Sequence, residues 1–240
     1  FKESEFVTRD VDYVASDMWL RLSIQRLRIE LEAVYLWGRA GDASMLPGVI
    51  MPELSFNQFG GVLQAEWQPS ARLPLTAMAE VGVASGDSAW GFGAWPSLDQ
   101  VKAEPGDLNG PQLALPDDRS VDNFRFHPNF HVDRILWRRI VGTFTDGVYA
   151  KGRLRWHPLP SLRLDADVVY SRALETKSAP GLARPLGVET GLELTWFARS
   201  GFEATGCYAV LMPLAGLRNP YTGAEAAPAH FAEARLAFRF

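Results

Sequence analysis

The stretch AEARLAFRF (residues 232–240) decides the fold class, because its side chains change character at every second position. One face carries apolar residues, namely Ala232, Ala234, Leu236, Phe238 and Phe240. The other face carries Glu233, Arg235 and Arg239. A period of two is that of a β-strand with one apolar and one polar face. The sequence therefore predicts an amphipathic strand here, with an aromatic residue as its last member.

The same alternation recurs along the chain, most clearly in LRIELEAVYLW (residues 27–37), where Leu27, Ile29 and Leu31 share one face and Arg28, Glu30 and Glu32 the other. We expect nine strands, at about 17–25, 27–37, 58–68, 73–85, 147–157, 162–173, 186–197, 201–212 and 231–240. Their lengths match the roughly 9–11 residues that a tilted strand needs to cross a bilayer. An all-β antiparallel transmembrane barrel fits this pattern.

The links between these segments alternate in length. Short turns fall at 25–27, 68–72, 157–161 and 197–201, and long segments fall at 38–57, 86–146, 174–185 and 213–230. Short turns on one side and long loops on the other are typical of outer-membrane barrels. Small residues on the apolar faces and aromatic residues at the strand ends, such as Trp67, Trp156 and Trp196, also favour a lipid-facing surface.

The final strand resembles the last strand of bacterial outer-membrane β-barrels. That resemblance implies that Phe238 and Phe240 belong to the signal read by the barrel-assembly machinery. It also implies a location in the outer membrane of a Gram-negative bacterium, in contact with lipid and lipopolysaccharide.

Composition excludes several other classes. The 240 residues are 47% hydrophobic, but no stretch approaches the roughly 18–20 apolar residues of a membrane helix. The net charge of -4 gives no argument for binding nucleic acid. Cys207 is the only cysteine, so no internal disulfide can form.

The start of the chain lacks the basic and apolar regions of a signal peptide. Following the short and long links backwards places residues 1–16 at the end of an external loop. Complete barrels of this kind have an even strand number. We therefore expect residues 1–240 to be one outer-membrane barrel domain, N-terminally truncated, with about nine strands of a larger barrel.

Charged residues opposite the apolar faces are candidates to line the pore. Those in the clearest strands are Lys151, Arg153, Arg155, Arg163, Asp165, Asp167, Glu189 and Glu193. A tight turn at HPLPS would place Arg153 opposite Asp165, Lys151 opposite Asp167 and Arg155 opposite Arg163. This arrangement predicts either a ladder of cross-strand ion pairs or a basic rung that attracts anionic solutes.

The segment 86–146 is too long for a passive link. Its first part is rich in Gly, Pro and Asp, which predicts irregular structure. The spacing of apolar residues in its second part predicts a short helix over 131–141, with a strand over 134–144 as the alternative. If the loop folds into the lumen, Arg134, Arg138 and Arg139 are candidates to line a constriction. Otherwise the loop covers the mouth of the barrel and these arginines face solvent or lipopolysaccharide.

His127, His131, Asp122 and Asp133 lie close together in the sequence, which raises the question of a metal site. Pro128 within the HxxxH spacing disfavours the helix that would align the two histidines. The four histidines also match no Ser–His or Asp–His catalytic arrangement. We expect no metal, no cofactor and no catalytic residue.

VASGD (residues 83–87) and the later stretch NFRFHPNFHVDRILWRRIVGTFTDGVY (residues 123–149) resemble an outer-membrane barrel family of myxobacteria and other deltaproteobacteria. That family is distantly similar to alginate-export-type porins. The resemblance implies a wide barrel of about eighteen strands with a hydrated lumen. The alginate-export porins have a strongly basic pore, whereas the lumen candidates here mix both signs, which argues against export of a polyuronate.

These observations predict a porin or export channel for passive diffusion of small polar or anionic solutes, and not an enzyme. Three alternatives remain open. The first is a plugged structural or receptor barrel that presents its loops for binding. The second is an integral membrane hydrolase, and the third is a soluble ligand-binding β-barrel.

Overall fold

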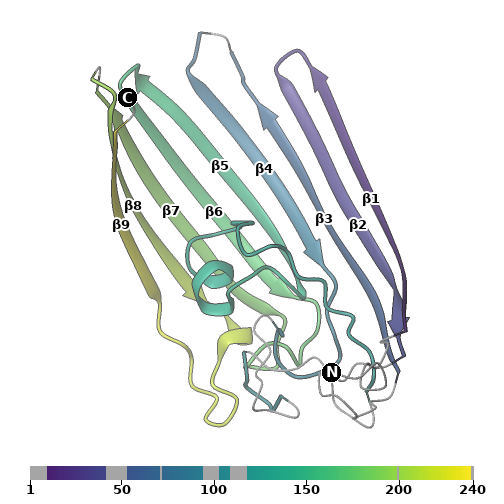
Figure 1. Ribbon diagram of the computed structural model, residues 1–240. Coiled ribbons are helices and arrows are strands. Elements are labelled where there is room, and N and C mark those ends of the chain that lie inside the picture. Colours follow the sequence, from purple (N-terminus) through teal and green to yellow (C-terminus); the bar gives the residue numbers. More distant parts are fainter. Residues whose placement is uncertain are drawn as a thin grey trace, which may run out of the picture.

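The computed structural model describes residues 10–41, 53–70, 72–93, 103–108, 118–198 and 200–238. Within them, nine strands form one antiparallel sheet in which every strand pairs with its neighbour in the sequence (Figure 1). The strands are β1 (Val11–Ile24), β2 (Leu27–Ala40), β3 (Leu54–Trp67), β4 (Leu75–Ala84), β5 (Gly147–Leu159), β6 (Leu162–Ala173), β7 (Pro185–Phe197), β8 (Phe202–Pro213) and β9 (Ala229–Phe238). The expectation of an all-β chain with nine antiparallel strands is confirmed.

The links also lie as expected. The four short links join the strands at one end of the sheet, and the four long ones join them at the other end (Figure 1). Strand β1 begins at Val11, six residues before the expected start, and pairs with β2 along its whole length. The prediction that residues 1–16 belong to a loop is therefore wrong for 11–16, because Asp12 and Ser16 fall on the otherwise apolar face of the strand and hide the alternation.

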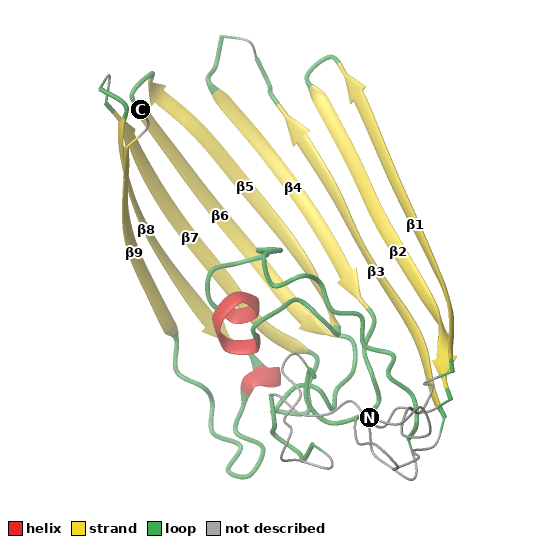
Figure 2. Cartoon of the chain, in the orientation of Figure 1, coloured by secondary structure: helices red, strands yellow, loops and turns green. Residues whose placement is uncertain are grey.

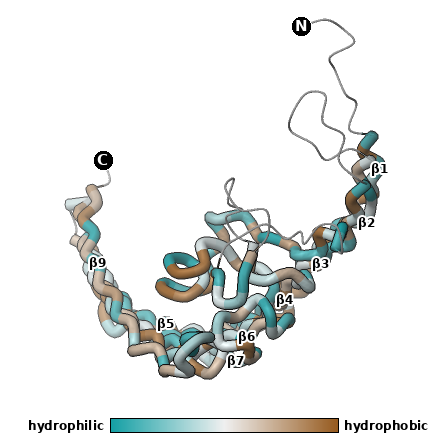
Figure 3. Tube along the Cα trace, turned by 90° about the horizontal axis from the view of Figure 1, so that it is seen from below, coloured by the Kyte–Doolittle hydropathy of each residue, from teal (hydrophilic) through white to brown (hydrophobic). Residues whose placement is uncertain are grey.

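The sheet is bent into an open arc with β1 and β9 at its two ends (Figure 3). Among the described residues, β1 pairs only with β2 and β9 only with β8, so the sheet is not closed. The described parts of the segment between β4 and β5 lie inside the arc, against its concave face (Figure 3).

Helical structure in the described part of the chain is limited to two short elements (Figure 2). One is a π-helical turn, η2 (Leu136–Val141), and the other is a 3-10 turn, η3 (Ala215–Leu217). The expected helix at 131–141 is present but begins five residues later, and the alternative strand at 134–144 does not form. Among the described residues, the structure contains no helix with the length and apolar character needed to span a membrane.

A hydrophobic core lies between this segment and the concave face. From the segment it takes apolar side chains, including Phe92, Val132, Ile135, Leu136, Trp137, Val141 and Phe144. From the sheet it takes Tyr149, Val169, Leu186, Ala209 and Leu211. Trp137 contacts both Phe92 and Phe144 edge to face, with ring centroids 5.6 and 5.0 Å apart. The concave face therefore has an apolar half under the segment, at the long-loop end, and a charged half towards the short turns.

Candidate functional site: the concave wall and the loop packed against it

The charged half of the concave face is a network of ion pairs across β5, β6 and β7. Asp165 pairs with Arg155 at 2.8 Å and with Arg163 at 2.9 Å. Arg163 also reaches Glu193 at 3.2 Å. The ladder of cross-strand ion pairs expected from the sequence is present, and it continues from strand to strand.

The register of this ladder differs from the expected one by two residues. Arg153 lies opposite Asp167 and Arg155 opposite Asp165, whereas Lys151 lies opposite Val169. The cause is a later turn, because β5 continues into the expected turn as far as Leu159, which pairs with Leu162, and a β-bulge lies between Trp156 and Leu159. Pro158 lies in this bulge and has no N–H to donate to a ladder.

Three of the eight pore-lining candidates are buried, namely Asp165, Asp167 and Glu189. Glu189 is only 1% exposed because the loop covers it. Glu189 therefore lies on the concave face, but beneath the loop and not against open space. Lys151, Arg153, Arg155, Arg163 and Glu193 remain partly exposed on the concave face.

The carboxylate of Glu189 binds the loop through its backbone. One oxygen accepts the N–H of Arg134 at 2.7 Å, and the other accepts the N–H groups of Ile135 at 3.0 Å and Leu136 at 3.3 Å. These three N–H groups precede or begin the η2 turn, where backbone donors lack partners within the helix. A buried carboxylate with three such donors makes charge-assisted hydrogen bonds, which are stronger than neutral ones.

Side chains of the same loop segment add three further attachments. Arg134 binds Asp167 on β6 at 2.7 Å and Glu193 on β7 at 3.3 Å. The indole N–H of Trp137 donates to Ser171 at 2.9 Å. In the opposite direction, Lys151 on β5 donates to the carbonyl of Val132 at 2.6 Å. Residues 132–137, here called the latch, are therefore fixed to β5, β6 and β7.

Of the three arginines proposed for a constriction, Arg134 is held against the wall and does not project into open space. Arg138 is exposed. Arg139 lies over the ring of Phe231 at 4.3 Å and is 3.9 Å from Glu233 on β9. Arg138 and Arg139 therefore remain candidates for a constriction, and Arg134 serves the latch.

A second attachment joins the loop to the ends of β3 and β4. Asp122 accepts the N–H of Asn57 at 2.9 Å, and its own N–H donates to Asp87 at 2.7 Å. Ser85 donates from its hydroxyl to the carbonyl of Asp122 at 2.6 Å. The loop is thus bound on both sides of the arc.

Three aspartates of the loop are buried and resist ionisation. Burial raises the pKa of Asp87 to about 6 and that of Asp146 to about 7. Burial, followed by the nearby charge of Glu189, raises the pKa of Asp133. The carboxylate of Asp133 accepts the N–H of Trp137 within the latch and that of Arg138 directly after it.

Three of the four residues considered for metal binding make other contacts. Asp122 and Asp133 bind backbone N–H groups, and His127 accepts the N–H of Asn129 at 3.1 Å. The described residues contain no group of three or more His, Cys, Asp or Glu that could hold a metal ion.

The assembly-signal candidates lie at the end of β9. Phe238 is its last residue, lies opposite Phe202 and is exposed. Phe240 lies outside the described residues.

Sequence reasoning missed several residues of the latch and its contacts, among them Asp133, Trp137, Tyr149 and Ser171. Tyr149, Ser171 and Glu189 lie on the concave face, but no local pattern in the sequence shows which backbone groups meet that face. An apolar Trp137 beside two arginines was the available signal for a buried contact.

Comparison with protein families gives no family model that matches the chain, and comparison with curated proteins gives no match either.

Proposed function

We propose that this chain forms the wall of an outer-membrane β-barrel that acts as a passive diffusion channel, with residues 86–146 narrowing its lumen. The observation that carries the proposal is the contrast between the two faces of the arc. The concave face holds the ion pairs and the loop. The convex face exposes large apolar side chains on every strand.

The convex side chains are those that alternate with the concave charges. They include Leu20, Leu22, Leu63, Val81, Leu154, Val168, Leu192, Leu194, Tyr208 and Leu236, each more than two-fifths exposed. Soluble monomers rarely expose a continuous apolar patch of more than a few hundred Å². A band that crosses nine strands matches the lipid-facing surface of a membrane barrel.

Aromatic residues border this band on both sides. Trp67, Trp156 and Trp196 lie near the short turns. Tyr35, Phe59 and Tyr170 lie nearer the long loops. Rings at two levels of the band support interfacial girdles, which sit at the boundary between lipid and water.

The two edges of the arc support a wider barrel. Strands β1 and β9 are long and exposed, and each leaves one row of backbone N–H and C=O groups without a strand partner among the described residues. Such groups are costly in lipid, so spanning sheets close on themselves. We propose that further strands complete the circle, as in the wide barrels that the family resemblance implies.

The channel would pass small polar solutes through the part of the lumen that the loop leaves open. The ion pairs of the wall offset each other, so the wall alone selects weakly by charge. The partners in this proposal are outer-membrane lipid, lipopolysaccharide and the assembly machinery that reads the C-terminal strand.

Conductance of the intact protein in a planar bilayer tests the channel. We expect stable ohmic steps that grow when residues 90–130 are deleted. If neither form conducts, although both are folded and inserted, the channel proposal fails.

A plugged structural or receptor barrel is the second candidate, and the latch is the observation that favours it. A loop bound through the buried Glu189 and Arg134 is a fixed element of the wall. A protein that inserts but conducts only after the deletion would support the plugged barrel.

A further inference from the structure

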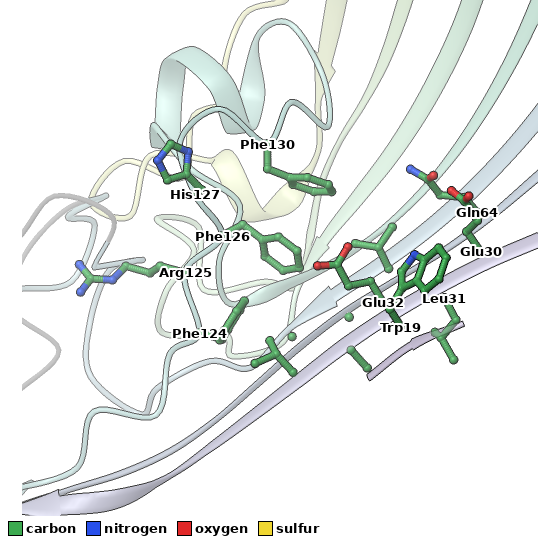
Figure 4. A pocket seen from close by; sticks show the side chains of 15 residues that line it. Trp19, Glu30, Leu31, Glu32, Gln64, Phe124, Arg125, Phe126, His127 and Phe130 are labelled. Atoms are coloured by element: carbon green, nitrogen blue, oxygen red, sulfur yellow. The ribbon is translucent and has the colours of Figure 1, made fainter. Parts of the chain in front are cut away.

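A pocket lies between the concave face of β1, β2 and β3 and the loop residues 124–130 (Figure 4). Its volume is about 340 Å³. Cavities of about 300–1,000 Å³ are typical of sites for small molecules. The pocket is separate from the latch, which lies against β5, β6 and β7.

One side of the pocket is an aromatic surface. Phe124 and Phe126 meet edge to face with centroids 5.1 Å apart, and Phe126 and Phe130 lie 4.6 Å apart. Phe124 is seated on Gly60 of β3, where a Cβ atom would come within 2.3 Å of the ring. Because only glycine leaves this space, the wall itself positions the aromatic group.

The opposite side carries negative charge. The side chains of Trp19 on β1 and of Glu30 and Glu32 on β2 line it (Figure 4). Glu30 forms an ion pair with Arg21. Glu32 is exposed and forms no ion pair with a Lys or Arg of the described residues. Its carboxylate points towards Phe126 (Figure 4).

The two basic side chains at the pocket point away from Glu32 (Figure 4). Arg125 donates to the carbonyl of Gly93 at 3.1 Å, and His127 accepts the N–H of Asn129. The pocket therefore combines aromatic faces with one carboxylate that lacks a cationic partner among the residues that the structure describes.

We propose that this pocket binds an organic cation, in particular a quaternary ammonium group. The charge of the cation lies against Glu32, and its methyl groups contact Phe124, Phe126 and Phe130. The ring of Trp19 already carries the guanidinium of Arg21, 5.2 Å from the ring centroid. Aromatic faces attract such cations through their quadrupole, and the attraction grows when the cation loses water. An anion would meet Glu32 without a compensating donor and is disfavoured.

The inference rests on the proposed function and deepens it, because it names the class of solute held beside the loop. It can still be tested without a conductance measurement. The intact protein in detergent is titrated with choline and with 3,3-dimethylbutan-1-ol, in which carbon replaces the charged nitrogen, and heat is measured by calorimetry. We expect choline to bind at least about tenfold more tightly than 3,3-dimethylbutan-1-ol. This ratio corresponds to the contribution that cation–π contacts and the charge of Glu32 make to the binding free energy.

Substitutions locate the binding. Glu32→Gln and Phe126→Leu each weaken choline binding by about tenfold or more. Glu66→Gln is the matched control, since Glu66 lies on the same face, pairs with Arg28 at 2.9 Å and does not line this pocket. We expect it to leave choline binding unchanged.

Three results would overturn the inference: no choline binding, equal binding of the neutral alcohol, or full binding by Glu32→Gln. If any of these results is found together with ohmic conductance, the channel proposal holds and the binding-site proposal fails. Choline binding without conductance would support the site and remove the channel.

Discussion

The carboxylate of Glu189 on β7 accepts the backbone N–H of Arg134 at 2.7 Å, across 55 positions of the chain. Because the same carboxylate also accepts the next two N–H groups, one buried side chain fixes the start of the η2 turn. The loop inside the arc is therefore positioned by the wall.

The Glu189→Gln substitution should loosen the latch while keeping the side-chain volume. An amide has one acceptor oxygen, so charge-assisted bonds to N–H groups are lost, each contributing about 1.5–3 kcal/mol. We expect faster hydrogen exchange at the amides of 134–137, measured by mass spectrometry. Glu233→Gln is the control, because its pair with Arg139 is half exposed at 3.9 Å. Unchanged exchange in the Glu189→Gln variant would argue against the latch.

Arg134 and Asp167 should show strong coupling in a double-mutant cycle. The Asp167 side chain is 1% exposed, so Arg134→Met leaves a buried charge whose remaining pair, with Arg153, is 4.0 Å long. Loss of one partner of a buried pair costs about 3–5 kcal/mol. We expect Arg134→Met combined with Asp167→Asn to be less destabilised than the sum of the single variants. Denaturant unfolding monitored by tryptophan fluorescence provides the four values, and additivity would show that the pair is not coupled.

Leu192→Arg tests whether the convex face meets lipid. Leu192 lies near the middle of β7 and is 55% exposed. In a bilayer, an arginine on the lipid face costs about 2–4 kcal/mol at the midplane. On a water-facing surface a substitution usually changes stability by less than about 0.5 kcal/mol. The free energy of unfolding from lipid vesicles, with Leu192→Met as the control, distinguishes a lipid-facing surface from a water-facing one. A small change in this free energy for Leu192→Arg would favour the soluble barrel.

Stability should fall as the pH rises from about 4 to about 7. Burial raises the pKa of Asp146 to about 7, above the roughly 3.9 of an unfolded aspartate. The folded state then binds the proton of Asp146 more tightly than the unfolded state does. The contribution of this group to the free energy of unfolding is therefore complete below pH about 4 and is lost as the pH rises through about 7. Asp87, with a pKa raised to about 6, acts in the same direction.

The Asp146→Asn variant measures this contribution. The full shift corresponds to at most about 4 kcal/mol. Denaturation midpoints at pH 5 and pH 8 should differ less in the variant than in the parent protein. An equal difference in both proteins would assign the pH dependence to other groups.

Most of the sheet could be predicted from the sequence, because period-two alternation survives wherever one face is apolar. The prediction failed at the start of β1, where Asp12 and Ser16 lie on the apolar face and interrupt the pattern, and at the bulge that contains Pro158. The face of each lumen candidate was predictable for the same reason. Their burial was not, because it depends on where a distant segment docks. Nothing within three or four residues of Glu189 indicates that it will meet the N–H groups of 134–136.

The position of the latch in the chain has a consequence for the order of assembly. Residues 132–137 are synthesised before Asp167, Ser171, Glu189 and Glu193, to which they attach. The loop therefore cannot dock until β5, β6 and β7 have paired. Pairing β4 with β5 while the segment between them is undocked costs roughly 2 kcal/mol more loop-closure free energy than closing a five-residue turn. In pulsed hydrogen exchange during refolding, amides of β5–β7 should gain protection before those of 134–136, and the reverse order would contradict this sequence of events. The interior of the arc is then the last part of the molecule to become ordered, after the wall that surrounds it.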